Sequence, residues 1–343
     1  MTIADLLLPW YAENQRTLPW RNHPDPYAVW VSEIMLQQTR VETVIAYFRR
    51  WMSAFPSVAD LAQADEREVL ALWEGLGYYS RARNLHRAAK VLVDDYAGKL
   101  PETPKDLLKL PGIGRYTAAA IASMAFGKDA AALDGNIRRV YARLFDVAAL
   151  LGKSETEKIF WSLANEHLPR GSAGDYNQAL MDLGATICTP RNPRCDSCPL
   201  REICRSYALG NQAERPLRKK KGKTPHYRHA AAVILQGGRV LLAKRPAEGL
   251  LGGMWEFPNG RVEGDSAEGL AAVIFAGYQV QIHVREPLCT VVHAYTHFKI
   301  TEDAYFCTLL ESSEKENLRW VAVDDLQNFP MGKVDREIAN RLS

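Results

Sequence analysis

The pattern of apolar and polar positions divides the chain into a helical first part and a strand-rich second part. Up to residue 208, apolar residues recur with a period near 3.6, which is typical of amphipathic helices. Capping signals predict helix starts at Asp25-Pro26, at the capping box Thr39-Arg40-Val41-Glu42, at Thr103-Pro104 and at 154–157. From residue 228 on, the period changes to two, which predicts strands.

The second part is predicted to be an α+β domain. Apolar runs at 231–235 and 240–243 flank Gly237-Gly238, which is a β-hairpin signature. Further strand-like runs cover 279–284, 289–300 and 305–310, and residues 266–278 predict one helix. Lysines and arginines crowd the segment before it, which predicts an exposed linker. We therefore expect domains at 1–208 and 228–343, joined by a basic linker at 209–227.

Length and charge narrow the classes of function only a little. A chain of 343 residues is long enough for two domains. Its net charge of +3 neither demands nor excludes nucleic acid, because the position of the charge decides this. No apolar run approaches the ~20 residues of a membrane helix, and the segment Met1–Asp5 lacks the basic start of a secretory leader. We expect a cytoplasmic protein with no membrane partner.

Four of the six cysteines fall within seventeen residues, with six, two and five residues between them: Cys188, Cys195, Cys198 and Cys204. Four thiolates this close together can enclose a zinc ion or an iron–sulfur cluster. The intervening residues are turn formers and charges, so a metal centre would supply the order that buried apolar surface does not. The alternative of two disulfides is disfavoured without a secretory leader. Spacing alone does not separate zinc from iron–sulfur.

A glycine-rich turn, 110–118, lies between two helical patterns. Gly112 and Gly114 permit backbone angles that other residues avoid, and they let N–H groups approach a ligand closely. The next helix starts at once, so its N-terminal dipole faces the same point. This arrangement suits one DNA phosphate; the alternative is an ordinary turn between helices.

At this point the chain resembles a known family. Leu-Pro-Gly-Ile-Gly at 110–114, followed by Thr117-Ala118, resembles the helix-hairpin-helix of base-excision DNA glycosylases. The cysteine spacing resembles the iron–sulfur loop of the endonuclease III and adenine glycosylase branch, and the segments 32–39 and 73–80 narrow the resemblance to the MutY-type adenine DNA glycosylases. Residues 255–260 resemble the segment that leads into a Nudix box. The implied fold is a mainly α helix-hairpin-helix domain with an iron–sulfur loop, followed by an α+β Nudix-like domain.

Two carboxylates fit the chemistry of base excision, in which the leaving base needs a proton and the sugar cation needs a negative charge. Glu33 shares a helix face with Trp30 and has apolar neighbours, which raise a carboxyl pKa. Asp134 precedes a predicted helix, whose N-terminal amides can keep it ionised. The alternatives are a solvated helix charge for Glu33 and a simple N-cap for Asp134.

The resemblance assigns roles to these and to two further residues. Glu33 would protonate adenine at N7, Asp134 would stabilise the sugar cation or briefly bond to C1′, and Asn136 would orient the site. Bifunctional relatives carry a lysine at the position of Tyr116, and Schiff-base chemistry requires that amine. We therefore expect a monofunctional glycosylase, with Tyr116 hydrogen-bonded near Asp134.

The resemblance also implies residues that contact DNA. Its intercalating residues match Gln37, Gln38 and Thr39 in one turn, and Leu76 and Tyr78 in another, while Arg21 matches a residue that lines the adenine pocket. Tyr295, Thr296 and His297 stand where the family commonly has Phe-Ser-His to recognise 8-oxoguanine. The helix after the Nudix-like segment has no carboxylate beyond Glu268, so we expect no pyrophosphatase activity.

By resemblance the four cysteines hold a structural [4Fe–4S] cluster. The expected partner is double-stranded DNA that contains adenine opposite 8-oxoguanine or guanine, bound by a monomer in the bacterial cytoplasm, at the nucleoid. Three alternatives are a bifunctional glycosylase/lyase similar to endonuclease III, a non-catalytic DNA-binding redox sensor, and a nucleotide hydrolase. The missing lysine and the second domain oppose the bifunctional enzyme, the retained Glu33, Asp134 and Tyr116 oppose the redox sensor, and the missing glutamates oppose the nucleotide hydrolase.

Overall fold

The computed structural model describes residues 1–21, 25–219, 222–312 and 315–342. The chain forms two compact units, the first made of residues 1–64 and 84–220 and the second of residues 65–83 and 221–343. A short segment of the predicted helical domain therefore belongs to the second unit. Lys220 and Lys221 of the predicted linker lie outside the described residues.

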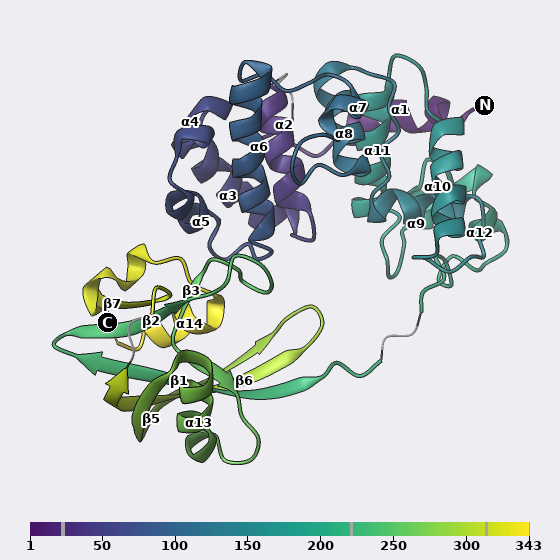
Figure 1. The fold of residues 1–343 in the computed structure, drawn as a ribbon. Helices are drawn as coiled ribbons and strands as arrows, with labels where there is room; N and C mark the ends of the chain where they lie inside the picture. Colours follow the sequence, from purple (N-terminus) through teal and green to yellow (C-terminus); the bar gives the residue numbers. More distant parts are fainter. Residues whose placement is uncertain (22–24, 220–221, 313–314, 343) are drawn as a thin grey trace. The chain divides into compact units, whose positions relative to one another are not determined.

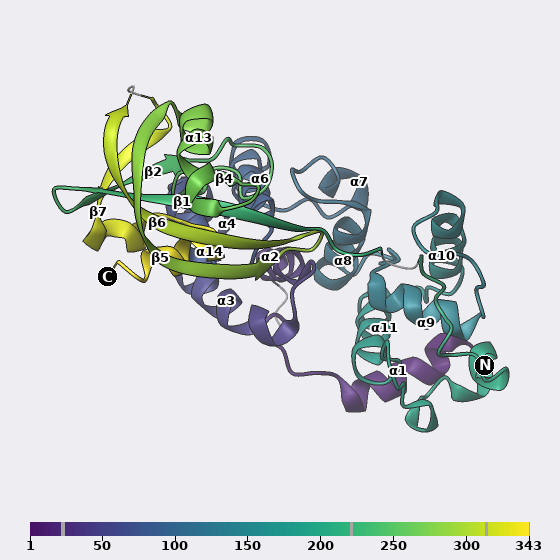
Figure 2. The same ribbon diagram turned by 90° about the horizontal axis from the view of Figure 1, so that it is seen from below.

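The first unit is helical (Figure 1). Its helices are α1 (Ile3–Asn14), α2 (Pro26–Leu36), α3 (Val41–Ala54), α4 (Val58–Gln63), α7 (Pro104–Leu107), α8 (Arg115–Phe126), α9 (Gly135–Leu144), α10 (Ser154–Glu166), α11 (Ala173–Thr186) and α12 (Arg205–Ala208), with the 3₁₀ turns η1 (Cys195–Ser197) and η2 (Arg201–Ile203). The helix α6 (Ser80–Tyr96) enters it from the second unit. Figures 1 and 2 both show α1 and α9 beside α11, and these helices share one apolar core.

Local signals fix several helix starts. Asp25 caps α2 with Pro26 at the first helical position, and Thr103 caps α7 in the same way. The capping box predicted at Thr39 is wrong, because the N-cap of α3 is Arg40 and no side chain caps it. Gln38 before it has a φ of 58°, and the Thr39 hydroxyl donates back to the Gln37 carbonyl (3.4 Å) instead of accepting from the helix.

The second unit contains a seven-stranded mixed sheet within residues 222–312 and 315–342. The strands are β1 (His226–Gln236), β2 (Arg239–Lys244), β3 (Trp255–Glu256), β4 (Asn259–Arg261), β5 (Val280–Ala294), β6 (Lys299–Ser312) and β7 (Leu318–Ala322). The order is β3-β2-β1-β6-β5, with β4 paired to β1 and β7 to β2; β1 and β6 run parallel.

Two helices cover this sheet, as Figures 1 and 2 show. Alternate residues of β1 point to opposite faces. Ala232 packs in the core of α13 (Ser266–Tyr278), and Val233 packs in the core of α14 (Lys333–Ala339). The unit also includes α5 (Glu66–Trp73) and the 3₁₀ helix η3 (Val323–Asn328).

Two expectations for the later part of the chain need correction. The predicted run 289–300 is interrupted, since β5 ends at Ala294 and residues 295–298 form the turn to β6. The linker is also not exposed throughout, because Arg215 pairs with Asp146 of the first unit (2.7 Å) and Leu217 forms a bridge with Leu150. No helix in the described part of the chain has the length and apolar character of a membrane span.

Candidate active site

Glu33 is a buried carboxyl on α2. Every residue from Tyr27 to Met35 is buried, so this helix has no polar face to carry the charge, and Glu33 is 4% exposed. Burial raises its pKa to about 7, although a hydrogen bond from Tyr116 and the nearby Arg21 oppose the shift. The sequence predicted this direction and its cause.

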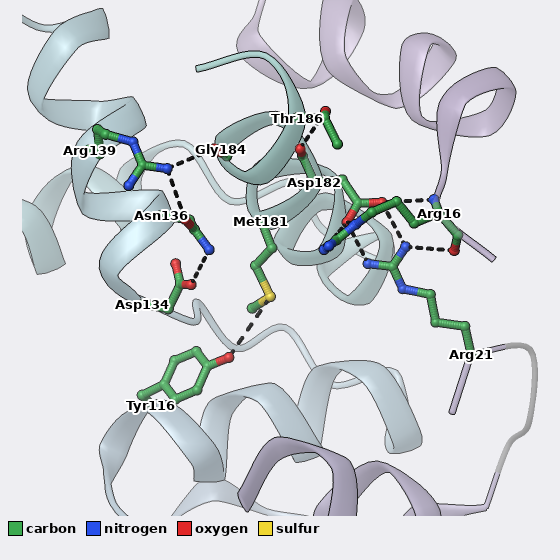
Figure 3. A network of polar contacts seen from close by, with 10 residues as sticks. All are labelled: Arg16, Arg21, Tyr116, Asp134, Asn136, Arg139, Met181, Asp182, Gly184 and Thr186. Carbon is green, nitrogen blue, oxygen red and sulfur yellow. Dashed lines mark hydrogen bonds and ion pairs between the residues drawn. The ribbon is translucent and has the colours of Figure 1, made fainter. Parts of the chain in front are cut away.

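Tyr116 is the partner of this carboxyl. It lies in the first turn of α8, its hydroxyl donates to Glu33 Oε2 (2.6 Å), and it contacts the sulfur of Met181 (3.9 Å; Figure 3). The sequence predicted a hydrogen-bonded Tyr116 near Asp134, and its partner Glu33 lines the same cavity as Asp134. Burial raises the pKa of Tyr116 well above 10, so the phenol stays a donor.

Asp134 is the N-cap of α9. Its Oδ1 accepts from the Ile137 amide (2.7 Å) and its Oδ2 accepts from the Asn136 side chain (3.0 Å; Figure 3). Burial raises the pKa of Asp134, and these two hydrogen bonds oppose the rise without cancelling it. The expected pull of the helix amides toward the ionised form is therefore present, but burial is the larger effect.

One cavity of about 500 Å³ brings the predicted residues together. It is lined by Glu33, Gln37, Gln38, Thr39, Tyr116, Asp134 and Asn136, together with residues that the sequence did not single out, such as Arg16 and Met181. Gln37 donates to Thr117 at the start of α8 (3.3 Å). An acid with a pKa near 7, a second carboxyl and a phenol thus share one space, which suits acid-assisted cleavage of a glycosidic bond.

Arg21 lies in a smaller cavity of about 90 Å³ that Glu33 and Trp20 also line. It forms a two-pronged ion pair with Asp182 of α11, through Nη1 to Oδ2 (2.6 Å) and Nη2 to Oδ1 (2.8 Å; Figure 3). The prediction placed Arg21 at an adenine pocket, and the structure places it beside Glu33.

The two glycines of the turn before α8 differ in backbone conformation and in the space around them. Gly112 has a φ of 78°, and a Cβ there would lie 2.6 Å from Asn84 Cβ, so both backbone angle and space require glycine. Gly114 is the N-cap of α8, and a Cβ there would meet no atom within 4 Å. The face of Gly114 is therefore open, as the proposed anion site requires.

The second unit brings the other two predicted segments together. Tyr78 has a φ of 49° and is 41% exposed, whereas Leu76 is buried. The Tyr78 hydroxyl forms a hydrogen bond with Thr296. A cavity of about 370 Å³ is lined by both residues, with Tyr295 and His297.

Comparisons with known proteins agree with this arrangement. The family description "HhH-GPD superfamily base excision DNA repair protein" matches residues 31–166, the iron–sulfur binding domain of endonuclease III matches 188–204, and a NUDIX domain matches 230–341. An adenine DNA glycosylase of Buchnera aphidicola subsp. Schizaphis graminum (strain Sg) is 38% identical over 75% of this chain and 74% of its own length. The chain belongs to the adenine DNA glycosylase family.

Two further relatives define the extent of the likeness. The adenine DNA glycosylase of Homo sapiens is 37% identical over 87% of this chain, which spans 65% of the human protein. A solved structure of a thermostable thymine-DNA glycosylase is 32% identical, with a TM-score of 0.55, over 60% of this chain and 95% of that one. This membership agrees with the fold class expected from the sequence.

The cysteine loop of this adenine DNA glycosylase family member fits the cofactor. Cys188, Cys195, Cys198 and Cys204 line one cavity. Burial raises the pKa of Cys198 to about 12, so a thiolate there needs a compensating cation, which cluster iron supplies. Arg143 donates to the sulfur of Cys188 (3.3 Å). The family match and this donor set assign a [4Fe–4S] cluster to the four cysteines.

The loop is tied to the site through α9. Arg139 donates to the Cys188 carbonyl (2.7 Å), to the Gly184 carbonyl (2.6 Å) and to the Asn136 side chain (2.8 Å), and Asn136 donates to Asp134 (Figure 3). A cofactor that orders the loop therefore also orders the hydrogen-bond partner of Asp134.

Sequence reasoning missed the contribution of α11, whose side chains contact several residues of the site. Asn177 binds the segment before Asp134 through Ala132 N (3.1 Å) and Ala130 O (2.9 Å). Met181 contacts Tyr116, and Asp182 holds Arg21. One signal was available: Asp182 falls three residues after the buried Ala179, and a charge on a buried stripe requires a partner.

Proposed function

We propose that the protein removes adenine from duplex DNA in which it stands opposite 8-oxoguanine or guanine, and leaves an abasic site. The observation that carries this proposal is Glu33, whose pKa of about 7 keeps a proton available at neutral pH in the cavity it shares with Asp134. In this reaction the bond between C1′ and N9 breaks and its electron pair leaves with the base.

Each residue of the cavity has one task in the proposed reaction. Glu33 gives its proton to N7 of the leaving adenine. Asp134 stabilises the sugar cation or bonds to C1′ for a short time, and Asn136 holds the Asp134 carboxyl in place. Water then adds its hydroxyl to C1′ and returns a proton to Glu33. Tyr116 has no amine, so no Schiff base forms and the reaction stops at the abasic site.

The remaining predicted residues bind DNA in this proposal. Extruding the base costs a few kcal/mol, and the wedge residues offset this cost by filling the gap. Gln37 and Gln38 enter the stack at the main cavity, with Thr39 beside them. Tyr78 forms the second wedge, because the predicted Leu76 is buried and cannot reach the stack. The turn at Gly112 and Gly114 holds one phosphate.

The Nudix-like part recognises the base opposite the adenine in this proposal. Thr296 presents a hydroxyl to the altered edge of 8-oxoguanine, and Tyr295 and His297 flank Thr296. The hydrogen bond between Thr296 and Tyr78 supports a lesion-reading residue beside a wedge residue. We assign the glycosylase domain to 1–208, the linker to 209–227 and the lesion-recognition domain to 228–343, in a monomer that acts at the bacterial nucleoid.

The test uses three duplexes, with adenine opposite 8-oxoguanine, guanine or thymine, followed by hot alkali. We expect strand breaks at adenine in the first two duplexes only. Glu33→Gln and Asp134→Asn should abolish the breaks while DNA binding persists in a mobility-shift assay. Cleavage by either variant at the wild-type rate would exclude the assigned roles, and efficient trapping of a covalent adduct by sodium borohydride would favour the bifunctional alternative.

A further inference from the structure

Asp182 is a completely buried carboxylate that binds two arginines. Its side chain is 0% exposed, while those of Arg21 and Arg16 are 7% and 27% exposed. Arg16 contributes its backbone amide to Oδ2 (3.0 Å) and its Nε to Oδ1 (2.7 Å), and Arg21 adds its two-pronged pair. Arg21 also donates to the Arg16 carbonyl (3.1 Å), so the three residues form one closed cluster (Figure 3).

The cluster carries one positive charge in excess, because two guanidiniums share one carboxylate. Burial alone would raise the pKa of Asp182, but its bonds to Arg21 and the charge of Arg16 outweigh burial and hold the pKa below its usual range. Asp182 is therefore ionised at neutral pH. Without the Asp182 carboxylate, the net charge of the cluster would be that of two arginines and not of one.

This charge faces the buried carboxyl of the site. Arg16 and Arg21 line the same small cavity as Glu33, and Arg16 also lines the main cavity. The other groups around Glu33 are Tyr116 from α8, Asp134 before α9, the uncharged Gln178 and Met181 of α11, and Arg138 of α9, which is held by Glu157. Arg21 pulls the pKa of Glu33 down and Asp134 pushes it up. Asp182 carries the negative charge that offsets the positive charges of Arg16 and Arg21.

We infer that Asp182 is a positioning residue. It fixes the guanidinium groups of Arg16 and Arg21 in the cavities that these arginines share with Glu33, and its negative charge offsets theirs so that Glu33 keeps its proton. This inference rests on the proposed function, because it assigns Asp182 a part in the same reaction. Two cations at fixed positions bring donor groups to an extruded purine, whose ring nitrogens accept hydrogen bonds. Because the Asp182 carboxylate binds the guanidinium groups of both arginines, it keeps them from moving onto Glu33 itself.

The experiment measures single-turnover excision from the duplex with adenine opposite 8-oxoguanine between pH 5.5 and 9. Asp182→Asn removes the negative charge at nearly constant volume. The midpoint at which the rate falls on the alkaline side should move down by about one pH unit, as expected for an extra charge at short range. The rate at pH 8 should fall about tenfold. Asp182→Glu, which keeps the carboxylate, should retain the wild-type midpoint.

Arg21→Gln gives a second test with the opposite sign. It removes one of the two cations, so the midpoint should move up, and the double variant Asp182→Asn with Arg21→Gln should return it to the wild-type position. Asp175→Asn is the matched control, because Asp175 is an exposed carboxylate on the same helix, and it should leave the profile unchanged. Melting temperature and the visible absorbance of the cluster report on folding for each variant.

The outcomes separate this inference from the proposed function. If the wild-type protein releases no adenine from either mispair, the proposed function itself is wrong. With an active wild type, an unmoved midpoint in Asp182→Asn, with a rate lowered equally at every pH, would make Asp182 merely structural and overturn the inference alone. If Asp182→Asn alone does not fold, the double variant with Arg21→Gln carries the test: a midpoint at the wild-type position supports the inference, and a midpoint as high as that of Arg21→Gln alone overturns it.

Discussion

The Tyr116 hydroxyl donates a 2.6 Å hydrogen bond to Glu33 Oε2 across 83 residues of sequence. Two opposite effects therefore act on one carboxyl. Burial favours its neutral form, and a donor hydrogen bond favours its charged form. Burial is the larger effect, and the resulting pKa of about 7 places the change of protonation near the pH at which proteins usually work.

The first prediction concerns the pH dependence of adenine excision. Glu33 carries its proton below its pKa and loses it above, so a reaction that needs the acid form should slow as pH rises through about 7. Single-turnover rates between pH 5.5 and 9 measure this. A rate that rises through the same range would show that Glu33 acts as a base.

Tyr116→Phe tests directly how the hydrogen bond opposes the effect of burial on the pKa of Glu33. It removes the hydrogen bond that favours the charged form, so the pKa of Glu33 should rise and the alkaline fall in rate should move to higher pH. Tyr47→Phe, a change on α3 away from the cavity, is the control and should leave the profile in place. A midpoint that stays constant or moves down in Tyr116→Phe contradicts the assignment.

Local signals explain which parts of the site the sequence could predict. The N-cap position of Asp134, the Asp25-Pro26 start of α2 and the helix at 266–278 depend on neighbours within a few residues. The turn at 295–298 contains neither glycine nor proline, so nothing in the local pattern separated β5 from β6.

The partners within the site could not be predicted in this way. The contact of Glu33 with Tyr116 joins α2 to α8, and that of Arg16 with Asp182 spans 166 residues. Such pairs arise from the packing of whole helices, and no spacing rule covers them. Resemblance supplied many residues of the cavity and placed Tyr116 near Asp134, but it did not name Glu33 as the hydrogen-bond partner of Tyr116.

Gly184→Ala should weaken the site through Asn136. A Cβ at this buried helical position would lie 2.7 Å from Asn136 Cβ and 3.2 Å from its Cα, so Asn136 must shift, and it is the side-chain partner of Asp134. We expect a loss of roughly 1–3 kcal/mol of stability, typical of overpacking, and about tenfold slower excision. Chemical unfolding and single-turnover rates measure the two effects.

The control for this substitution is Gly277→Ala on α13. A Cβ there meets no atom within 4 Å, so the change should keep the excision rate and stabilise the helix by about 0.5–1 kcal/mol. Equal rates for Gly184→Ala and wild type would mean that the position of Asn136 does not matter to the reaction.

The two glycines of the turn before α8 should respond differently to alanine. At Gly112 the positive φ and the contact with Asn84 make alanine destabilising. At Gly114 a Cβ has open space, so the melting temperature should stay within a few degrees of wild type while DNA affinity falls, because the methyl group occupies the phosphate position. Binding measured at several salt concentrations checks this. Unchanged affinity in Gly114→Ala would place the phosphate elsewhere.

The last prediction concerns the Nudix-like part, where three carboxyls lie around one guanidinium. Glu256, Glu302 and Asp335 are buried, and Arg245 pairs with Glu256. Burial first, and then the charge of Glu256, raise the pKa of Asp335 to about 7. A carboxyl whose pKa is raised by folding binds its proton more tightly in the folded state, so stability falls as pH rises from the unfolded pKa of ~4 to about 7.

Asp335→Asn should remove this dependence, because an amide stays neutral and its oxygen can still accept from the Phe257 amide, as Oδ1 does now (3.0 Å). Hydrogen exchange of β1 and β6, corrected for intrinsic rates, should show similar protection of the two proteins at about pH 4 and better protection of the variant at pH 8, on the order of 1–3 kcal/mol. Asp324→Asn, an exposed change in η3, should follow the wild type. Better protection of the wild type at pH 8 would mean that Asp335 is held as a favourable charge, and the assignment of a protonated acid in this core would be wrong.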